Sequence, residues 1–226
     1  MRAFTRRRGR YVAHIDSTER EILARVVADT AALLGEPPGM SREEAASTES
    51  TAENPDEAAA PQSEAEAADD EQHTEDLRAH LERLDEDVPA PTDPALARLL
   101  PDASPDDADL SAEFRRLTQA ELRDEKIQRL HMVWAALRAP GSKLNIDPDQ
   151  AMDWAAALTD VRLVLSERLG IRTDEDAEDI YALAAVPRTE DPSPEEELRL
   201  AMASVYSAFT WLQESLVQVM LPTVGD

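Results

Sequence analysis

The sequence of 226 residues contains no cysteine. This absence excludes disulfide bonds, thiolate metal sites, catalytic thiols and thiol redox switches within the chain. Aromatic residues are also scarce, at 4% of the sequence. We therefore expect a core of Leu, Val, Ala and Met, a composition that favours helices over sheets.

Long apolar runs and the usual catalytic motifs are absent as well. No run approaches the ~20 apolar residues of a membrane span, and the basic start lacks the apolar stretch of a secretory signal. These two absences predict a cytoplasmic protein without a membrane partner. Six glycines form no phosphate-binding loop, and four scattered histidines form no HExxH motif. We expect no enzymatic activity and no catalytic, cofactor-binding or metal-binding residues.

Charge is strongly segregated along the chain, whose formal net charge is −25. Residues 36–93 hold 19 acidic side chains and three arginines, which gives this segment a net charge of −16. Its Pro, Ala, Ser and Glu composition cannot bury enough apolar area to offset the entropy of ordering, so it is predicted to be a disordered acidic insert. Within it, Leu77, Leu81 and Leu84 have the spacing of a short amphipathic helix.

The first ten residues have the opposite charge, with five arginines and no acid. Strand-favouring residues on either side of Arg8 and Gly9 predict a β-hairpin that must pack on other elements. The candidate partner-binding residues here are Arg6, Arg7, Arg8 and Arg10. The sequence leaves three interpretations open for them: a solvated turn, a clamp for phosphate or an acidic protein surface, and a dock for the acidic insert.

Capping residues and apolar periodicity predict helices over 16–35, 94–100, 118–138, 147–170, 172–186 and 193–219. The apolar stripe of the first of these is expected to consist of Ile22, Val26, Leu33 and Leu34. Together they predict a mainly α fold, a helical bundle with a short N-terminal β-hairpin and a long disordered acidic insert.

Four of the helix starts rest on capping signatures. Asp16 and Glu19 have the spacing of a capping box, and so do Thr118 and Glu121, Asp147 and Gln150, and Ser193 and Glu196. Gly170 is expected to end the helix over 147–170 in the left-handed conformation. The twelve residues 139–150 are predicted to be a loop that ends in the box of Asp147 and Gln150.

The last helix has the most regular pattern in the chain. Its apolar residues recur with alternating steps of four and three, at Leu198, Met202, Val205, Phe209, Leu212, Leu216 and Val219. Such a heptad seam is typical of a central bundle helix packed on its own chain, or of a helix shared with a second copy in a homodimer.

Two polar groupings border apolar helix faces and are the remaining candidate partner-binding residues. Asp160 and Arg162 cannot face each other two residues apart on a helix, so each needs a partner elsewhere. Gln213 and Glu214 lie next to the heptad seam. All four are interpreted either as hydrogen-bonding groups that tie helices together or as part of a partner-binding patch.

The segments "DPALARLLPDA", "EFRRLTQAELRDEK", "WAAALTDVRLVLSERLG" and "VYSAFTWLQESLV" resemble the actinobacterial AosR family, as do the start "RRRGRYVAHID" and the end "WLQESLVQ". This family is named for an oxidative-stress transcriptional regulator. The resemblance implies a cytoplasmic regulator that acts through a sigma factor or RNA polymerase and responds to oxidants through cysteines. The cysteine response cannot apply to a chain without cysteine.

These observations predict one globular domain, formed by residues 1–35 and 94–226, with the acidic insert at 36–93 between its two parts. The predicted function is a non-enzymatic regulator of transcription that binds a sigma factor or RNA polymerase. Direct DNA binding is disfavoured by the net negative charge. The alternative is an adaptor outside transcription, for example one that delivers clients to a protease.

Overall fold

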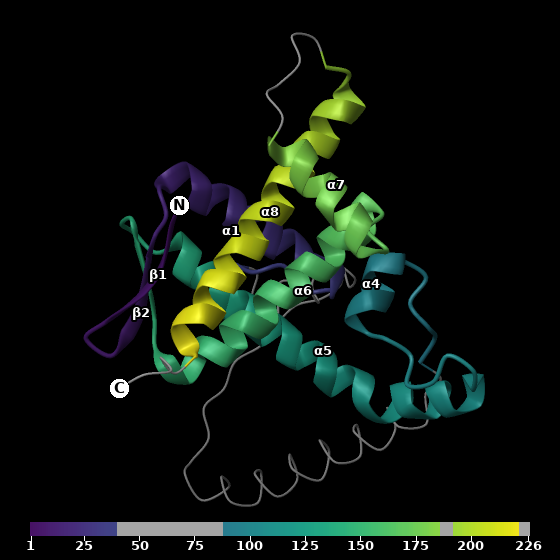
Figure 1. Ribbon diagram of the computed structural model, residues 1–226. Coiled ribbons are helices and arrows are strands. Elements are labelled where there is room, and N and C mark those ends of the chain that lie inside the picture. The colour runs from purple at the N-terminus through teal and green to yellow at the C-terminus, as the bar shows by residue number, and fades with distance from the viewer. Residues whose placement is uncertain (40–87, 186–191, 222–226) are drawn as a thin grey trace, which may run out of the picture. The chain divides into compact units, whose positions relative to one another are not determined.

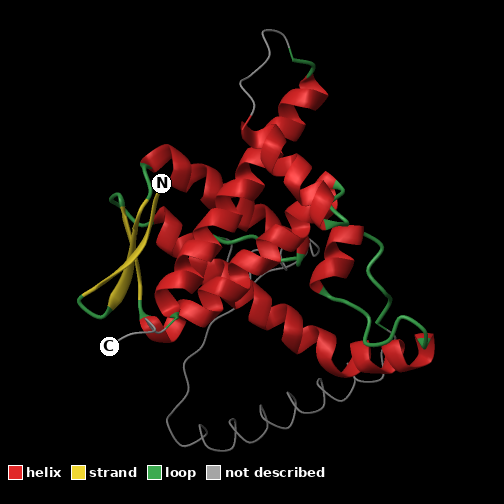
Figure 2. Ribbon diagram, in the orientation of Figure 1, coloured by secondary structure: helices red, strands yellow, loops and turns green. Residues whose placement is uncertain are grey.

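The computed structural model describes residues 1–39, 88–185 and 192–221 (Figure 1). Helices dominate these ranges, and the strands form one small antiparallel sheet (Figure 2). The predicted fold class is therefore confirmed. The predicted insert, including the amphipathic helix at Leu77, Leu81 and Leu84, lies outside the described residues except at its two ends.

Contacts between residues divide the chain into two compact units. The first unit comprises 1–39, 91–101 and 123–226, and the second comprises 40–90 and 102–122. The single domain expected from the sequence stays a prediction. The features described below belong to the first unit unless stated otherwise.

The sheet has the order β1-β2-β3. The predicted hairpin is confirmed, with β1 at Arg2–Arg7 and β2 at Arg10–His14. The third strand, β3 at Lys143–Ile146, pairs with β2 and lies in the segment that was expected to be a loop. That expectation was wrong because Leu144 and Ile146 alternate with polar neighbours and complete the buried face of the sheet.

One face of the sheet is part of the core. Its buried residues are Phe4, Tyr11, Ala13, Leu144 and Ile146. β1 lies beside α8, and the backbone N–H of Phe4 donates to Ser215 Oγ at 3.5 Å. Burial of one face supplies the packing that an isolated hairpin lacks.

Helix α1 spans Ser17–Leu33 and begins with a capping box between Asp16 and Glu19. The predicted stripe is buried at Leu34 but not at Ile22, which is 46% exposed, and Leu23 and Val27 are buried instead. The prediction was wrong at Ile22 because α1 has two overlapping apolar stripes at the same i, i+4 spacing, and only one of them meets the core.

The helices after the insert begin with α4 at Pro94–Leu99, where the Asp93 side chain accepts from the Ala95 N–H as an N-cap. Helix α5 spans Ala108–Arg138, so it starts ten residues before the predicted box at Thr118. Asp107 caps it by accepting from the Leu110 N–H, and the Thr118 hydroxyl instead donates to the Phe114 carbonyl.

The box predicted at Asp147 is also absent: its side chain makes no capping bond, and a short 3₁₀ turn, Pro148–Gln150, leads into α6 at Ala151–Leu169. Gly170 ends α6 in the left-handed conformation, as predicted. Helix α7 spans Asp174–Ala185.

Helix α8 spans Pro194–Met220 and starts with a capping box between Ser193 and Glu196. It packs on α6 and α7. The C-terminal half of its heptad seam is in the core, where Phe209, Leu212 and Leu216 are fully buried. Trp154 and Leu158 of α6, the helix on which α8 packs, are fully buried as well. The N-terminal half is not: Leu198 is 62% exposed.

Candidate functional site

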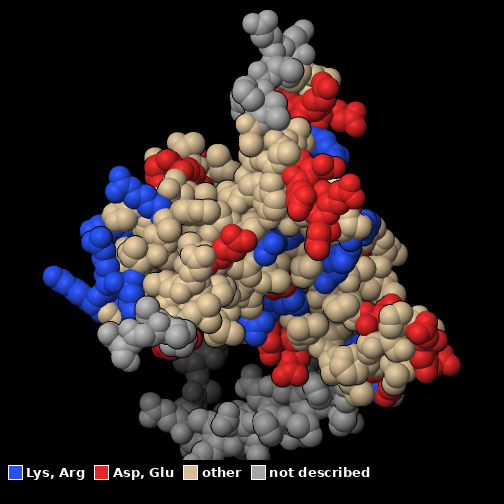
Figure 3. All heavy atoms as spheres, in the orientation of Figure 1, with Lys and Arg blue, Asp and Glu red and all other residues tan. Residues whose placement is uncertain are grey.

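The outer face of the sheet is a basic hollow of about 720 Å³. It combines four cationic side chains with one imidazole, one apolar and one amide side chain, and its lining residues are Arg7, Arg8, Arg10, Val12, His14, Lys143 and Asn145. We call this surface the basic sheet face. The blue side chains gathered over the hairpin in Figure 3 mark this region.

The strand register explains why these residues share one face. Arg7 is opposite Arg10 across the β1–β2 pair, and His14 is opposite Lys143 across the β2–β3 pair. Directly opposed residues of antiparallel strands point to the same side of a sheet. The sheet thus brings Arg7, Arg10 and His14 to the same face as Lys143, a cation that no local pattern could place there.

The hairpin turn presents Arg8 in a strained conformation. Arg8 has φ 49° and Gly9 has φ 81°, which are the two positive values that a two-residue hairpin turn needs. Glycine or asparagine normally occupies the first of these positions, because a left-handed conformation costs other residues about 1 kcal/mol. An arginine is therefore held at the tip of the hairpin against its backbone preference.

Most of the positive charge on this face has no counter-charge. Arg10 Nε lies 2.8 Å from Asp147 Oδ1, and both side chains are largely exposed. Among the residues that the structure describes, Arg7, Arg8 and Lys143 make no ion pair. An exposed cation cluster of this kind suits an anionic partner, because arginine binds carboxylates and phosphates in a bidentate manner.

Arg6, the fourth predicted arginine, lies apart from this cluster. It is opposite Tyr11 in the register, on the side of the sheet that faces the core, and its own side chain is exposed at the edge. The structure therefore brings Arg7, Arg8 and Arg10 together and leaves Arg6 outside the hollow.

Arg20 supports the sheet from within the fold, and sequence analysis missed it. This residue of α1 is only 4% exposed. Its Nε donates to the Leu137 carbonyl at 2.9 Å, and one terminal nitrogen donates to Ala136 and Ala139 at 2.5 and 2.6 Å. The other donates to the Lys143 carbonyl at 3.4 Å.

These carbonyls include the last turn of α5, whose backbone acceptors have no partner within the helix. Arg20 therefore joins α1, the end of α5 and β3 with one side chain. Burial lowers the pKa of the Arg20 guanidinium from its ordinary value. The one sign of its burial in the sequence is its position: Arg20 precedes Leu23 by three residues and Val27 by seven, so it lies on the same apolar stripe of the helix.

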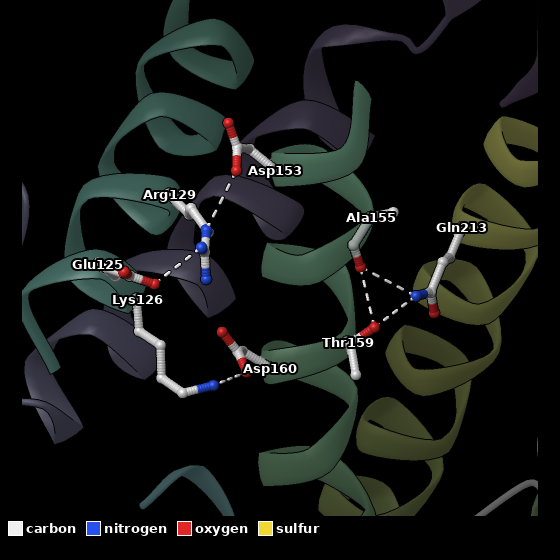
Figure 4. Close-up of polar contacts among 8 residues, drawn as sticks. All are labelled: Glu125, Lys126, Arg129, Asp153, Ala155, Thr159, Asp160 and Gln213. Carbon is white, nitrogen blue, oxygen red and sulfur yellow. Dashed lines mark hydrogen bonds and ion pairs between the residues drawn. The ribbon is translucent and has the colours of Figure 1, made fainter. Parts of the chain in front are cut away.

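Asp160 is used between helices rather than at the surface. It is 3% exposed on α6, and Lys126 of α5 donates to its Oδ1 at 2.6 Å (Figure 4). The other carboxylate oxygen is buried without a hydrogen-bond partner. Burial raises the pKa of Asp160, and the Lys126 ammonium opposes this shift only in part.

Arg162 and Gln213 bind each other between α6 and α8. Arg162 donates to Gln213 Oε1 at 2.6 Å and lies over the Tyr206 ring. The Gln213 amide nitrogen donates to the Ala155 carbonyl at 3.0 Å and to Thr159 Oγ1 at 2.6 Å (Figure 4). These contacts tie the two helices together.

Glu214 differs from its neighbours, since it is exposed and its side chain has no hydrogen bond or ion pair within the described part of the chain. The four polar candidates thus do not form one patch. The basic sheet face is the stronger candidate for partner binding because its charges are both clustered and uncompensated.

Across residues 1–39, 88–185 and 192–221, no group of three or more histidine or acidic side chains is arranged to hold a metal ion. No helix there combines the length and apolar character needed to cross a membrane.

Comparison with known proteins places the chain in a family. The chain is 31% identical, over 144 aligned residues, to proteins named "Oxidative stress regulator AosR" from Mycobacterium bovis and from two strains of Mycobacterium tuberculosis. The alignment covers 58% of this chain, and the chain spans 60% of the length of those relatives. No solved structure is significantly similar.

The resemblance predicted from the sequence is therefore confirmed. A second match is broader, extending over residues 1–220 to the family described as "Domain of unknown function (DUF2017)". Since this match covers nearly the whole chain, the protein belongs to the DUF2017 family.

Proposed function

We propose that this protein is a non-enzymatic, cytoplasmic regulator of the oxidative-stress response that binds a sigma factor or RNA polymerase through its basic sheet face. The observation that carries the proposal is the cluster of Arg7, Arg8 and Lys143 without counter-charges. The name of the mycobacterial relatives supports the regulatory role.

The chemistry of the face favours an acidic protein surface. Its only ring is the His14 imidazole, and it includes no Phe, Tyr or Trp side chain on which successive bases of single-stranded nucleic acid could stack. The chain as a whole has a net charge of −25, which repels the phosphate backbone of DNA beyond this small patch. An acidic protein segment can meet the patch alone.

The regulator would work without a thiol switch, because the chain has no cysteine. Its response to oxidants would then come from its partner, its abundance or its methionines rather than from a disulfide. The alternative function, an adaptor that delivers clients to a protease, uses the same face with a different partner.

The test is a cross-linked pull-down of the tagged full chain from its own cells, with and without peroxide. The sheet variant changes Arg7 and Lys143 to Ser. A matched control changes Arg138 and Arg199 to Ser, two exposed arginines on α5 and α8 that make no ion pair among the described residues. Both variants remove the same charge, so only position distinguishes them.

We expect a sigma factor or RNA polymerase with the wild type and the control, and loss of it with the sheet variant. Protease components in its place would support the adaptor. Equal recovery by all three proteins would contradict the role of the sheet face. Specific capture of duplex DNA at ~0.15 M salt, lost in the sheet variant, would contradict a protein partner.

A further inference from the structure

A second surface feature is an apolar groove of about 680 Å³ between α1 and the N-terminal half of α8. Its apolar lining comes from four helices and consists mainly of Ile22, Val26, Leu165, Leu198, Met202 and Val205. None of these residues belongs to the basic sheet face. The groove is therefore separate from the proposed regulatory contact.

One wall of the groove is the second apolar stripe of α1. Leu23 and Val27 are buried in the core, whereas Ile22 is 46% exposed and Val26 is half-buried beside it. Residues four apart lie one above the other on a helix, so Ile22 and Val26 form a continuous apolar ridge. The described part of the chain covers only one of the two stripes.

The other wall is the uncovered half of the α8 heptad seam. The seam keeps its four-three spacing from Leu198 to Val219, but its own bundle buries it only from Phe209 onward. Leu198 is 62% exposed, and Met202 and Val205 are half-buried. Single exposed apolar side chains are ordinary, but two facing apolar ridges are typical of an interaction surface.

The charges at the groove indicate what covers it. Arg25 and Asp29 lie on its α1 side and Glu197 on its α8 side, all exposed. Within the described residues none of the three makes an ion pair. Arg25 and Glu197 have opposite charges on opposite walls, and a twofold rotation about an axis along the groove exchanges the two walls, so each of them can meet the other in a second copy. Asp29 lies one turn beyond Arg25 on the α1 wall and is not part of this pairing.

We propose that this groove is the interface of a homodimer with twofold symmetry. The axis along the groove places α1 of each copy against α8 of the other, so that Ile22 meets Leu198 and Arg25 meets Glu197. Each contact occurs twice. A foreign helix with a single-sign flank would leave either Arg25 or Glu197 without a partner, which is why we favour a second copy.

The interface is small. Stable dimers usually bury about 800 Å² on each partner, and few side chains line this groove. We therefore expect a reversible dimer with a dissociation constant in the range of ~10 to ~100 µM.

Sedimentation equilibrium of the full chain, from ~1 to ~300 µM at ~0.15 M salt, tests the proposal. The wild type is expected to change from the monomer mass of 25.0 kDa toward twice that value. Leu198→Glu should remain monomeric. Leu110→Glu is the matched control, since Leu110 is 52% exposed on α5 and lies outside the groove.

A charge exchange tests the pairing itself. Arg25→Glu and Glu197→Arg, taken singly, should each weaken the dimer about ten-fold, because each creates two like-charge contacts. The double variant should recover most of this loss. A monomer at all concentrations, a dimer that survives Leu198→Glu, or a double variant as weak as the single ones would each overturn the proposal. Far-ultraviolet circular dichroism of every variant confirms that it is folded.

Discussion

Among the described residues, Arg20 alone has a side chain that bonds α1 to both the end of α5 and β3 through backbone carbonyls, and substitution by methionine removes these bonds. Methionine keeps most of the apolar volume, so the change isolates the hydrogen bonds. Bonds from a charged donor contribute about 1.5–3 kcal/mol each when water cannot replace them.

Water can replace only some of these bonds. Ala139 is exposed and Ala136 is half-buried, so their carbonyls can be solvated after the substitution. Leu137 is 3% exposed, so its carbonyl is left buried without this donor. We therefore expect a loss of about 3 kcal/mol in the free energy of unfolding. Arg20→Lys keeps the charge but not the planar fork, and should lose about 1–2 kcal/mol.

Urea unfolding followed by circular dichroism and by tryptophan fluorescence measures both variants. Arg138→Met is the control, because this exposed arginine should change the free energy of unfolding by no more than about 0.5 kcal/mol. A loss below about 1 kcal/mol for Arg20→Met would refute the assignment of Arg20 as a helix-terminating and sheet-positioning residue.

Three further substitutions test other parts of the account. Asp160→Asn should change the pH dependence of stability, because the raised pKa of Asp160 means that the folded state binds a proton more tightly than the unfolded state. The wild type should therefore lose stability relative to Asp160→Asn as the pH rises above ~4. Parallel curves of the free energy of unfolding against pH, measured by urea unfolding from pH ~4 to ~7, would contradict the burial effect. Arg8→Asn should raise the free energy of unfolding by about 0.5–1 kcal/mol by relieving the left-handed strain and should lower partner recovery, whereas a destabilised variant would show that the turn is not strained. Gln213→Leu should lose about 1–2 kcal/mol in thermal or urea unfolding, because the Ala155 and Thr159 contacts between α6 and α8 disappear, and an unchanged midpoint would show that these bonds add nothing.

The helices and the hairpin could be predicted because their signals are local. Capping boxes at Asp16 and Ser193, the closing Gly170 and the strand residues around Arg8 and Gly9 all act within a few positions of each other. The start of α5 was missed because Asp107 caps it without the box spacing. Thr118 has the box spacing but lies inside the helix.

The candidate site needed contacts between distant segments. Lys143 joins the basic face only because β3 pairs with β2, and the two short apolar positions of β3 give little indication of that pairing. Arg20 binds carbonyls more than a hundred positions away, and backbone carbonyls leave no mark in a sequence. The sequence also could not separate Arg6 from Arg7, because the face of each depends on the register of the hairpin.

We propose that one face of the sheet, rather than positive charge in general, binds the partner. Arg6 and Arg7 are adjacent on β1 but point to opposite sides, so Arg6→Glu and Arg7→Glu change the net charge equally at nearly the same place. Quantitative recovery of the sigma factor or RNA polymerase by the two variants is the most direct measurement. The account predicts recovery near the wild-type amount for Arg6→Glu and a loss of at least about ten-fold for Arg7→Glu. Equal losses, or no loss from Arg7→Glu, would contradict it.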